Sequence, residues 1–140
     1  MRLREGRMGK QRILLVQGDA RFREGFALAL QRALAAESLD VAFVEADSLV
    51  EARERLREGG LDAALIDVRL PDGDGLEFVR ELNDGAAGRI PTLVLTAYLD
   101  HMVAAQAMDA GAKGALSKVV SVPETTEAIK WLTSSERPGG

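Results

Sequence analysis

Three side chains that could handle a phosphoryl group stand at the ends of apolar segments of the chain. Asp67 follows the run 63–66, Thr96 ends the segment 89–96, and Lys118 ends the segment 113–118. A carboxylate can act as a nucleophile and form an aspartyl phosphate. An ammonium group can pair with that carboxylate and then with a phosphoryl oxygen, and a hydroxyl can donate to another oxygen. Asp67, Thr96 and Lys118 are therefore candidates for phosphoryl chemistry.

Each of these residues also has an ordinary explanation. An aspartate after a strand often bonds only loop amides, threonine has a high strand propensity, and lysine is common as a solvated charge at a sheet edge. Their joint arrangement favours function, because ligands bind in open α/β sheets at the carboxyl ends of the strands.

The elements that must position these residues alternate strictly along the chain. Each apolar segment is followed by residues at helical spacing. We expect Asp19 to cap the first helix, Ser48 and Glu51 to form a capping box, and a turn after Pro71 to lead into a helix near Asp74. Strict alternation predicts an α/β fold, a five-stranded parallel sheet with helices on both faces. The strands are expected at 12–16, 40–46, 63–67, 89–96 and 113–118.

Composition limits the class of protein. The 140 residues, 46% of them hydrophobic, fit one domain with a sizeable core. The chain has no cysteine and a single histidine, which excludes thiolate chemistry and a histidine-rich metal site. No apolar run reaches membrane-spanning length, and the amino terminus lacks the apolar core of a signal peptide. We expect a cytoplasmic protein with no membrane partner.

The charge is unevenly spread. Of the 18 basic and 22 acidic residues, five basic and one acidic lie in residues 1–12, so the remainder has a net charge of −8. An acidic body argues against direct nucleic-acid binding by the folded part. We expect a disordered basic leader at 1–11, one domain at 12–133, and a tail or linker at 134–140.

Four motifs together resemble the receiver domain of two-component response regulators, over residues 12–133. They are Ile13–Val16, Leu65–Pro71 followed by Asp74–Leu76, Leu95–Ala97, and Ala110–Gly114 leading to Lys118. The resemblance implies a flavodoxin-like three-layer α/β/α fold with strand order 2-1-3-4-5. It also implies a signalling module rather than an enzyme, with Asp67 as phosphoacceptor, Thr96 and Lys118 as partners of the phosphoryl group, and a histidine kinase as phosphodonor.

The resemblance further implies a Mg²⁺ site, and here the chain departs from the family pattern. The implied ligands are Asp67, Asp19 and the backbone carbonyl of Arg69. Gln17 and Gly18 stand where the family usually has two adjacent acidic residues, so we expect Mg²⁺ binding to be weak or absent. Asp19 could reach the metal or serve only as a helix cap. No organic cofactor is expected.

Two further departures concern output. Ala115 replaces the aromatic residue that the family normally has in its fifth strand. Lys118 is followed by Val119 rather than proline, which resembles the subgroup joined to DNA-binding domains of the LuxR type. We expect a possible DNA-binding output domain outside this chain. Self-association is expected through the face of the fourth helix, fifth strand and fifth helix, where Met102, Met108 and Trp131 could be exposed.

Three other functions deserve comparison with these residues. A degenerate pseudo-receiver that acts as a phosphorylation-independent interaction module remains open. An FMN-binding flavodoxin needs a hydroxyl-rich phosphate loop, and residues 18–21 are too acidic and too poor in hydroxyls. An aspartyl-phosphate hydrolase would need a second acid two residues after its nucleophile in the first loop, and Asp19 and Arg21 do not supply that pair.

Overall fold

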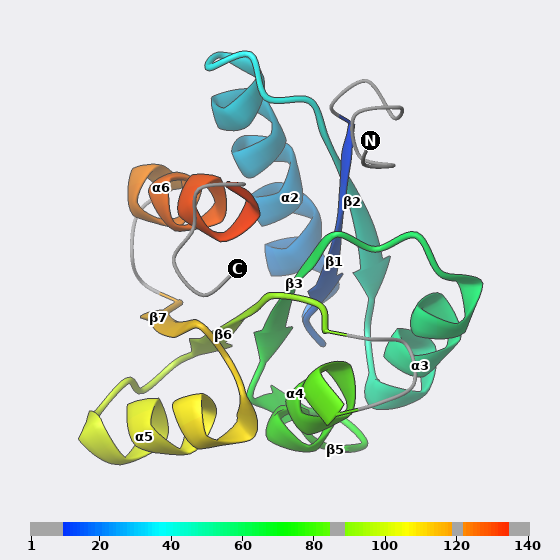
Figure 1. The fold of residues 1–140 in the computed structure, drawn as a ribbon, viewed down its shortest axis with the longest axis vertical. Helices are drawn as coiled ribbons and strands as arrows, with labels where there is room; N and C mark the ends of the chain where they lie inside the picture. The colour runs from blue at the N-terminus through cyan, green and yellow to red at the C-terminus, as the bar shows by residue number, and fades with distance from the viewer. Residues whose placement is uncertain (1–9, 85–88, 119–121, 135–140) are drawn as a thin grey trace.

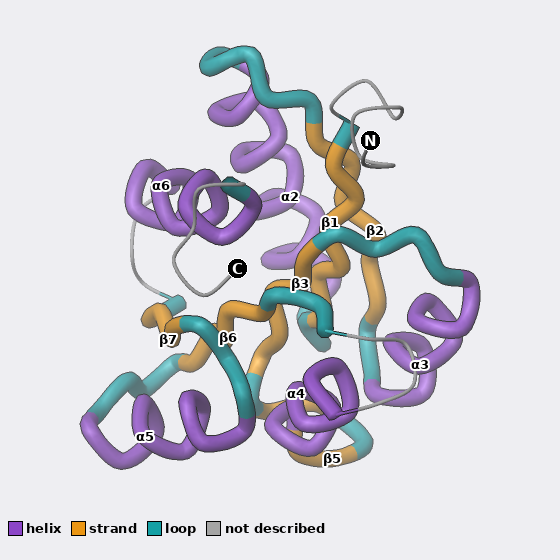
Figure 2. The backbone as a smooth tube through the Cα atoms, in the orientation of Figure 1, coloured by secondary structure: helices purple, strands orange, loops and turns teal. Residues whose placement is uncertain are grey.

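A parallel sheet of five strands forms the centre of the protein. The computed structural model describes residues 10–84, 89–118 and 122–134 (Figures 1 and 2). The strand order β2-β1-β3-β6-β7, with parallel pairing throughout, confirms the predicted order 2-1-3-4-5. The strands are β1 (Gln11–Val16), β2 (Val41–Ala46), β3 (Ala63–Asp67), β6 (Thr92–Thr96) and β7 (Gly114–Ser117).

In the described part of the chain, five helices cover the two faces of this sheet. Helices α2 and α6 lie against one face, and α3, α4 and α5 lie against the other (Figure 1). The predicted three-layer α/β/α arrangement is therefore confirmed. The helices are α2 (Ala20–Ala35), α3 (Leu49–Glu58), α4 (Gly75–Asp84), α5 (His101–Ala110) and α6 (Val122–Thr133).

Strand β1 shows why the sheet is buried on both faces. Successive side chains of a strand point to opposite faces. Ile13 and Leu15 pack in the cluster with α2 and α6, whereas Leu14 and Val16 pack in the cluster with α3, α4 and α5. All four side chains are fully buried. A continuous apolar run is thus what a central parallel strand requires.

Side chains at the helix starts act largely as predicted. Asp19 Oδ1 accepts the N–H of Phe22 at 3.2 Å, and Ser48 Oγ accepts the N–H of Glu51 at 3.2 Å. The Glu51 side chain differs from a regular capping box, because its Oε1 accepts the N–H of Asp47 at 2.8 Å. Both caps satisfy helix N–H groups that have no partner within the helix.

Some boundaries differ from the sequence prediction. Strand β6 begins at Thr92 rather than at residue 89, because Pro91 lacks an N–H for the ladder and contributes only its carbonyl, which accepts the N–H of Ala64. The expected turn after Asp67 contains a small antiparallel ribbon, β4 (Arg69–Leu70) and β5 (Gly73–Asp74). The first strand begins one residue early, at Gln11. Residues 1–9, 119–121 and 135–140, which include most of the expected leader and tail, lie outside the described residues.

Gly75 allows helix α4 to start directly against the end of β3. Its N–H donates to the carbonyl of Val68 at 2.7 Å. A Cβ at this position would lie 2.0 Å from the carbonyl oxygen of Asp67 and 3.2 Å from Cγ2 of Ile66. Only glycine permits this approach, which brings the backbone of α4 next to Asp67.

Candidate functional site

The candidate residues meet at the carboxyl edge of the sheet. Residues that follow β1, β3, β6 and β7 line a cleft of about 650 Å³. The structure brings the predicted Asp67, Thr96 and Lys118 together there, with Asp19 and Arg69 on the same lining. Apolar and aromatic side chains complete the wall, namely those of Leu70, Pro71, Tyr98 and Val103. This is the edge at which open α/β sheets bind ligands.

The carboxylate of Asp67 is buried and held by three donors. Its side chain is 5% exposed. Oδ2 accepts hydrogen bonds from Lys118 Nζ at 2.9 Å and from Gln17 Nε2 at 2.8 Å. Oδ1 accepts a longer one from the N–H of Arg69 at 3.3 Å. One ammonium group therefore compensates the negative charge, and two neutral donors help to orient the carboxylate.

Gln17 has a role that sequence reasoning missed. Its amide oxygen Oε1 accepts the N–H of Asp19 at 3.0 Å, and its Nε2 faces Asp67. If the amide were rotated by half a turn, its NH₂ group would face the N–H of Asp19 and its oxygen would face the carboxylate of Asp67. Both contacts would be repulsive, so the two hydrogen bonds fix the orientation of the amide. From the sequence, Gln17 is expected only to weaken metal binding by replacing an acidic residue. The signal available in the sequence was that a carboxamide can also donate.

Lys118 is placed by both its backbone and its side chain. Its N–H donates to the carbonyl of Thr96 at 2.8 Å, which fixes the chain just beyond β7. Its Nζ lies 5.6 Å from the centre of the Phe22 ring, at a distance suited to a cation–π contact. Phe22 in turn stacks on Phe26 with ring centres 5.0 Å apart. Through Phe22, helix α2 thus contributes to holding the ammonium group in place.

Thr96 and Ala115 lie on the neighbouring strands β6 and β7. The Thr96 hydroxyl accepts the N–H of Tyr98 at 3.2 Å and donates to the Tyr98 carbonyl at 3.4 Å. It is therefore engaged with the loop after β6 rather than with Asp67. Ala115 is half-buried on β7 and packs against the core under α3, α4 and α5.

Asp72, in the turn between β4 and β5, caps helix α3 from a distant part of the chain. Its Oδ1 accepts the N–H of Leu49 at 2.8 Å, and its Oδ2 accepts the N–H of Val50 at 3.0 Å. These hydrogen bonds, that of Leu49 foremost, lower the pKa of Asp72 below its ordinary value. The segment that follows Asp67 is thereby tied to the start of α3.

Asp72→Asn is expected to lower the free energy of unfolding at neutral pH. The neutral amide has only one oxygen and no negative charge, so it cannot replace both carboxylate oxygens that accept the N–H groups of α3. The pKa of Asp72 is lower in the folded than in the unfolded protein, so its contribution is complete above the ordinary pKa of aspartate. It disappears as the pH falls through the lower pKa of the folded state. Urea unfolding should show the two proteins converging in acid; a difference independent of pH would contradict this account.

Among the described residues, no group of three or more histidine, cysteine, aspartate or glutamate side chains is arranged to hold a metal ion. Asp19 is exposed, and its carboxylate oxygen accepts the N–H of Phe22 as a helix cap. Within the same ranges, no helix has the length and hydropathy needed to cross a lipid bilayer.

Known proteins are similar to this chain in sequence and in fold. The swarming motility regulation protein RssB of Serratia marcescens is 34% identical over 119 residues, which cover 84% of this chain and 51% of RssB. The response regulator protein PilR of Pseudomonas aeruginosa is 34% identical over 131 residues, which cover 94% of this chain and 28% of PilR. The chain therefore spans about half or less of the length of these curated relatives.

Solved structures agree with these relatives. A two-component response regulator of the LuxR family from an Aurantimonas species superimposes with a TM-score of 0.75 at 29% sequence identity, covering 89% of this chain and 85% of that one. The family model described as the response regulator receiver domain matches residues 13–130. With the parallel sheet and the Asp67–Lys118 edge already established, the match places this chain in the response regulator receiver domain family.

Proposed function

We propose that Asp67 accepts a phosphoryl group from the phosphohistidine of a histidine kinase. The observation that carries this proposal is the buried Asp67 carboxylate, with Lys118 Nζ at 2.9 Å, at the floor of an open cleft. The site suits acceptance because the nucleophile is fixed and a cation stands beside it. Receiver domains are signalling modules, so the outcome of the reaction is a change in partner binding.

We propose that the transfer is impaired by the lack of carboxylates at Gln17 and Gly18, because Lys118 alone offsets the repulsion between Asp67 and the incoming phosphoryl group. An oxygen of Asp67 forms the new bond to phosphorus while the bond from phosphorus to the histidine nitrogen breaks. The electron pair of the broken bond stays on the imidazole, which takes up a proton. Lys118 then moves from the carboxylate to a phosphoryl oxygen, and Thr96 exchanges its bonds to Tyr98 for another phosphoryl oxygen.

Mg²⁺, which receiver domains generally bind at an acidic site, does not fit the residues present here. Mg²⁺ favours oxygen ligands in octahedral geometry. Gln17 instead presents its NH₂ group to Asp67, and its only side-chain oxygen already accepts the N–H of Asp19. Asp67, Asp19 and the Arg69 carbonyl would be the ligands, and Asp19 would first have to leave its helix cap. We propose that metal binding is weak or absent.

The same contacts favour a second candidate function, a pseudo-receiver that binds partners without phosphorylation. Gln17 and Lys118 together hold one oxygen of Asp67, so the carboxylate is already oriented and compensated without any ligand. A protein in this form could keep one conformation permanently. The experiment below separates this candidate from the first.

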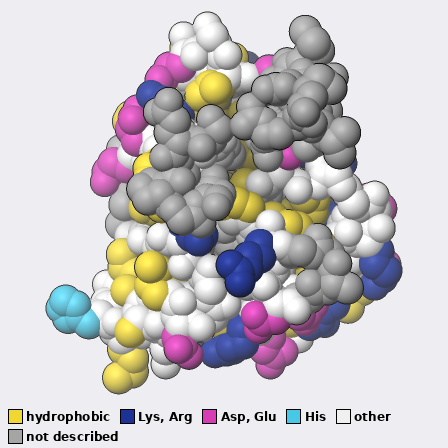
Figure 3. Space-filling view, in the orientation of Figure 1, with side chains coloured by type: hydrophobic (Ala, Val, Ile, Leu, Met, Phe, Trp, Pro, Cys, Tyr) yellow, Lys and Arg dark blue, Asp and Glu magenta, His cyan; other side chains and the backbone are white. Residues whose placement is uncertain are grey.

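We propose that output uses the face of α5, β7 and α6. Met102, Met108 and Trp131 are exposed on these helices, with 70%, 52% and 44% of their surface accessible. Figure 3 shows hydrophobic side chains gathered at the corner near α5. One longer relative, 38% identical over 89 residues, is the DNA-binding transcriptional activator DevR/DosR of Mycobacterium tuberculosis. For this chain, a DNA-binding output domain remains a proposal.

The protein should gain one phosphoryl group when incubated with a small acyl phosphate, as measured by intact mass, and Asp67→Asn should abolish the gain. The phosphorylated protein should also change its state of association, as measured by sedimentation. Met102→Glu should suppress that change while leaving the mass gain intact.

Two outcomes would count against phosphoryl acceptance. One is an unchanged mass at high phosphodonor concentration, which would favour the pseudo-receiver. The other is a gain in mass that persists in Asp67→Asn, which would show that another residue accepts the phosphoryl group. Thr92→Val serves as a control for handling, because Thr92 lies at the opposite end of β6 from Thr96 and its hydroxyl donates to the carbonyl of Ile90.

A further inference from the structure

A chain of polar contacts leads from Asp67 through Gln17 to an ion pair on the far side of β1. The backbone carbonyl of Gln17 accepts a hydrogen bond from Arg23 Nη1 at 2.8 Å, while its side chain donates to Asp67. The backbone of Gln17 is thus held by Arg23 at its carbonyl and by Ala46 at its N–H, which donates to the Ala46 carbonyl at 3.0 Å, while its carboxamide is directed at Asp67. The side chain of Gln17 is nearly fully buried, so it has few alternative positions.

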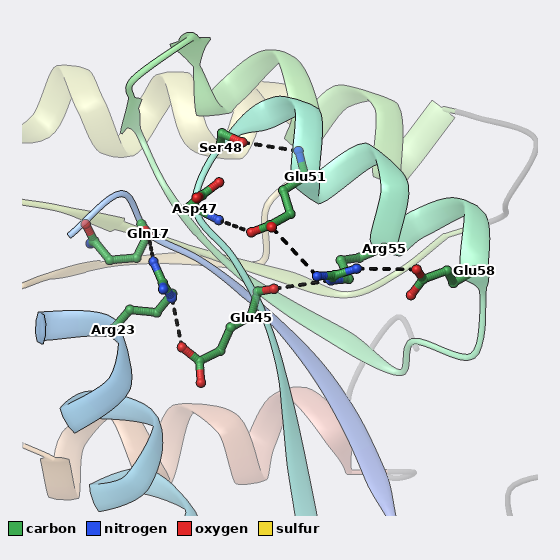
Figure 4. A network of polar contacts seen from close by, with 8 residues as sticks. All are labelled: Gln17, Arg23, Glu45, Asp47, Ser48, Glu51, Arg55 and Glu58. Atoms are coloured by element: carbon green, nitrogen blue, oxygen red, sulfur yellow. Dashed lines mark hydrogen bonds and ion pairs between the residues drawn. The ribbon is translucent and has the colours of Figure 1, made fainter. Parts of the chain in front are cut away.

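Arg23 is itself held in place. Its Nε pairs with Glu45 Oε1 at 2.8 Å, and its side chain is only 12% exposed against 35% for Glu45 (Figure 4). Its backbone N–H donates to the carbonyl of Asp19 at 2.9 Å. The guanidinium therefore spans from α2 across the end of β1 to β2. A planar group with several fixed donors suits such a bridge better than a flexible ammonium.

We propose that Arg23 is a positioning residue for the acceptor site. Oriented by Glu45, it holds the backbone of Gln17 so that the carboxamide donates to Asp67. This inference rests on the proposed function of Asp67 as acceptor, because the geometry that Arg23 maintains is that of the acceptor carboxylate. Neither Arg23 nor Glu45 touches Asp67 itself, so their effect passes through Gln17.

Arg55 offers a matched control in the same network. It also bonds Glu45, but through the backbone carbonyl, with Nε at 3.3 Å. Its remaining partners are the side chains of Glu51 and Glu58. Figure 4 shows that it approaches β2 from α3, on the side away from Gln17. Arg55→Gln removes the same charge as Arg23→Gln without loosening Gln17.

The test is the side-chain amide signal of Gln17 in nitrogen-15 NMR, identified by its loss in Gln17→Ala. In Arg23→Gln the side-chain amide protons of Gln17 should exchange with water roughly tenfold faster. The reason is that Gln17, no longer held at its carbonyl, should keep its hydrogen bond to Asp67 for less of the time. Arg55→Gln should leave the exchange rate unchanged. Glu45→Gln, which keeps Arg23 but removes its charged partner, should give a smaller increase in the same direction.

The kinetic counterpart uses a small acyl phosphate. In Arg23→Gln the phosphorylation rate at saturating donor should fall several-fold, with the half-saturating concentration unchanged, because Lys118 and Thr96 are untouched. A Gln17 amide that is unaffected in folded Arg23→Gln, or equally affected in Arg55→Gln, would overturn the proposal. If Arg23→Gln does not fold, Glu45→Gln decides by the same criteria. Failure of phosphorylation in the wild type would refute the proposed function alone, since the amide signal is read without it.

Discussion

Gln17→Glu is expected to make the protein depend on a divalent cation. The substitution replaces the donor that lies 2.8 Å from Asp67 Oδ2 with a carboxylate oxygen. Two unit charges about 3 Å apart repel by roughly 1.4 kcal/mol in water and about 5 kcal/mol at an effective dielectric constant of about 20. We therefore expect the variant to lose about 2 kcal/mol or more of its free energy of unfolding at neutral pH without metal.

Mg²⁺ should reverse that loss. A carboxylate about 4 Å from a divalent cation contributes roughly 2 kcal/mol even at the dielectric constant of water, or about 30-fold in Kd. Titration calorimetry should show tighter Mg²⁺ binding by the variant, and its thermal midpoint should rise with Mg²⁺ while that of the wild type stays constant. Gln31→Glu is the control, because Gln31 also donates through Nε2, to the carbonyl of Val41, far from the cleft. Equal Mg²⁺ affinity in wild type and Gln17→Glu would show that another ligand set operates.

Position 17 is a cleaner test than position 18. An acidic residue at both positions is the natural design from the sequence. In the structure a Cβ on Gly18 would lie 3.1 Å from Cδ and 3.2 Å from Cγ of Pro71, so the proline ring would have to shift. A Gly18→Asp variant would therefore mix a change in charge with a displacement of the turn after Asp67.

Gly75→Ala is expected to be the most destabilising single-methyl change in the site. The added Cβ would overlap the carbonyl oxygen of Asp67 at 2.0 Å, and both atoms belong to or adjoin the backbone. Overpacking of this kind costs about 1–3 kcal/mol and occasionally more. We therefore expect the free energy of unfolding, measured by urea unfolding, to fall by about 3 kcal/mol. Phosphoryl acceptance should fall as well, because relief of the overlap must move either α4 or Asp67.

Gly25→Ala provides the opposite control. Gly25 lies in the interior of α2, and a Cβ there would meet nothing within 4 Å. Alanine is favoured over glycine in a helix by about 1 kcal/mol, so this variant should be slightly more stable than the wild type. If both substitutions changed stability equally, the close approach of α4 to Asp67 would not be the reason for glycine at position 75.

The chain order of elements was readable because it rests on local patterns. Short apolar runs, helical spacing and capping residues such as Asp19 and Ser48 act within a few residues, and strict alternation leaves few topologies for a parallel sheet. The position of Asp67 at the carboxyl edge followed from that alternation. The ribbon after Asp67 was missed because its two-residue strands carry no periodicity.

Only the tertiary structure decided which groups donate hydrogen bonds to the oxygens of Asp67. Gln17 and Asp67 are 50 residues apart, and the direction of the Gln17 amide depends on the N–H of Asp19 at its other end. The tie from Arg23 to Glu45 likewise joins separate elements. By itself the sequence determined the sheet, its edge and the residue types gathered there, since those follow from hydrophobic burial along the chain. Donor and acceptor directions depend on neighbours brought together by folding, so the hydrogen-bonded environment that orients Asp67 became visible only in three dimensions.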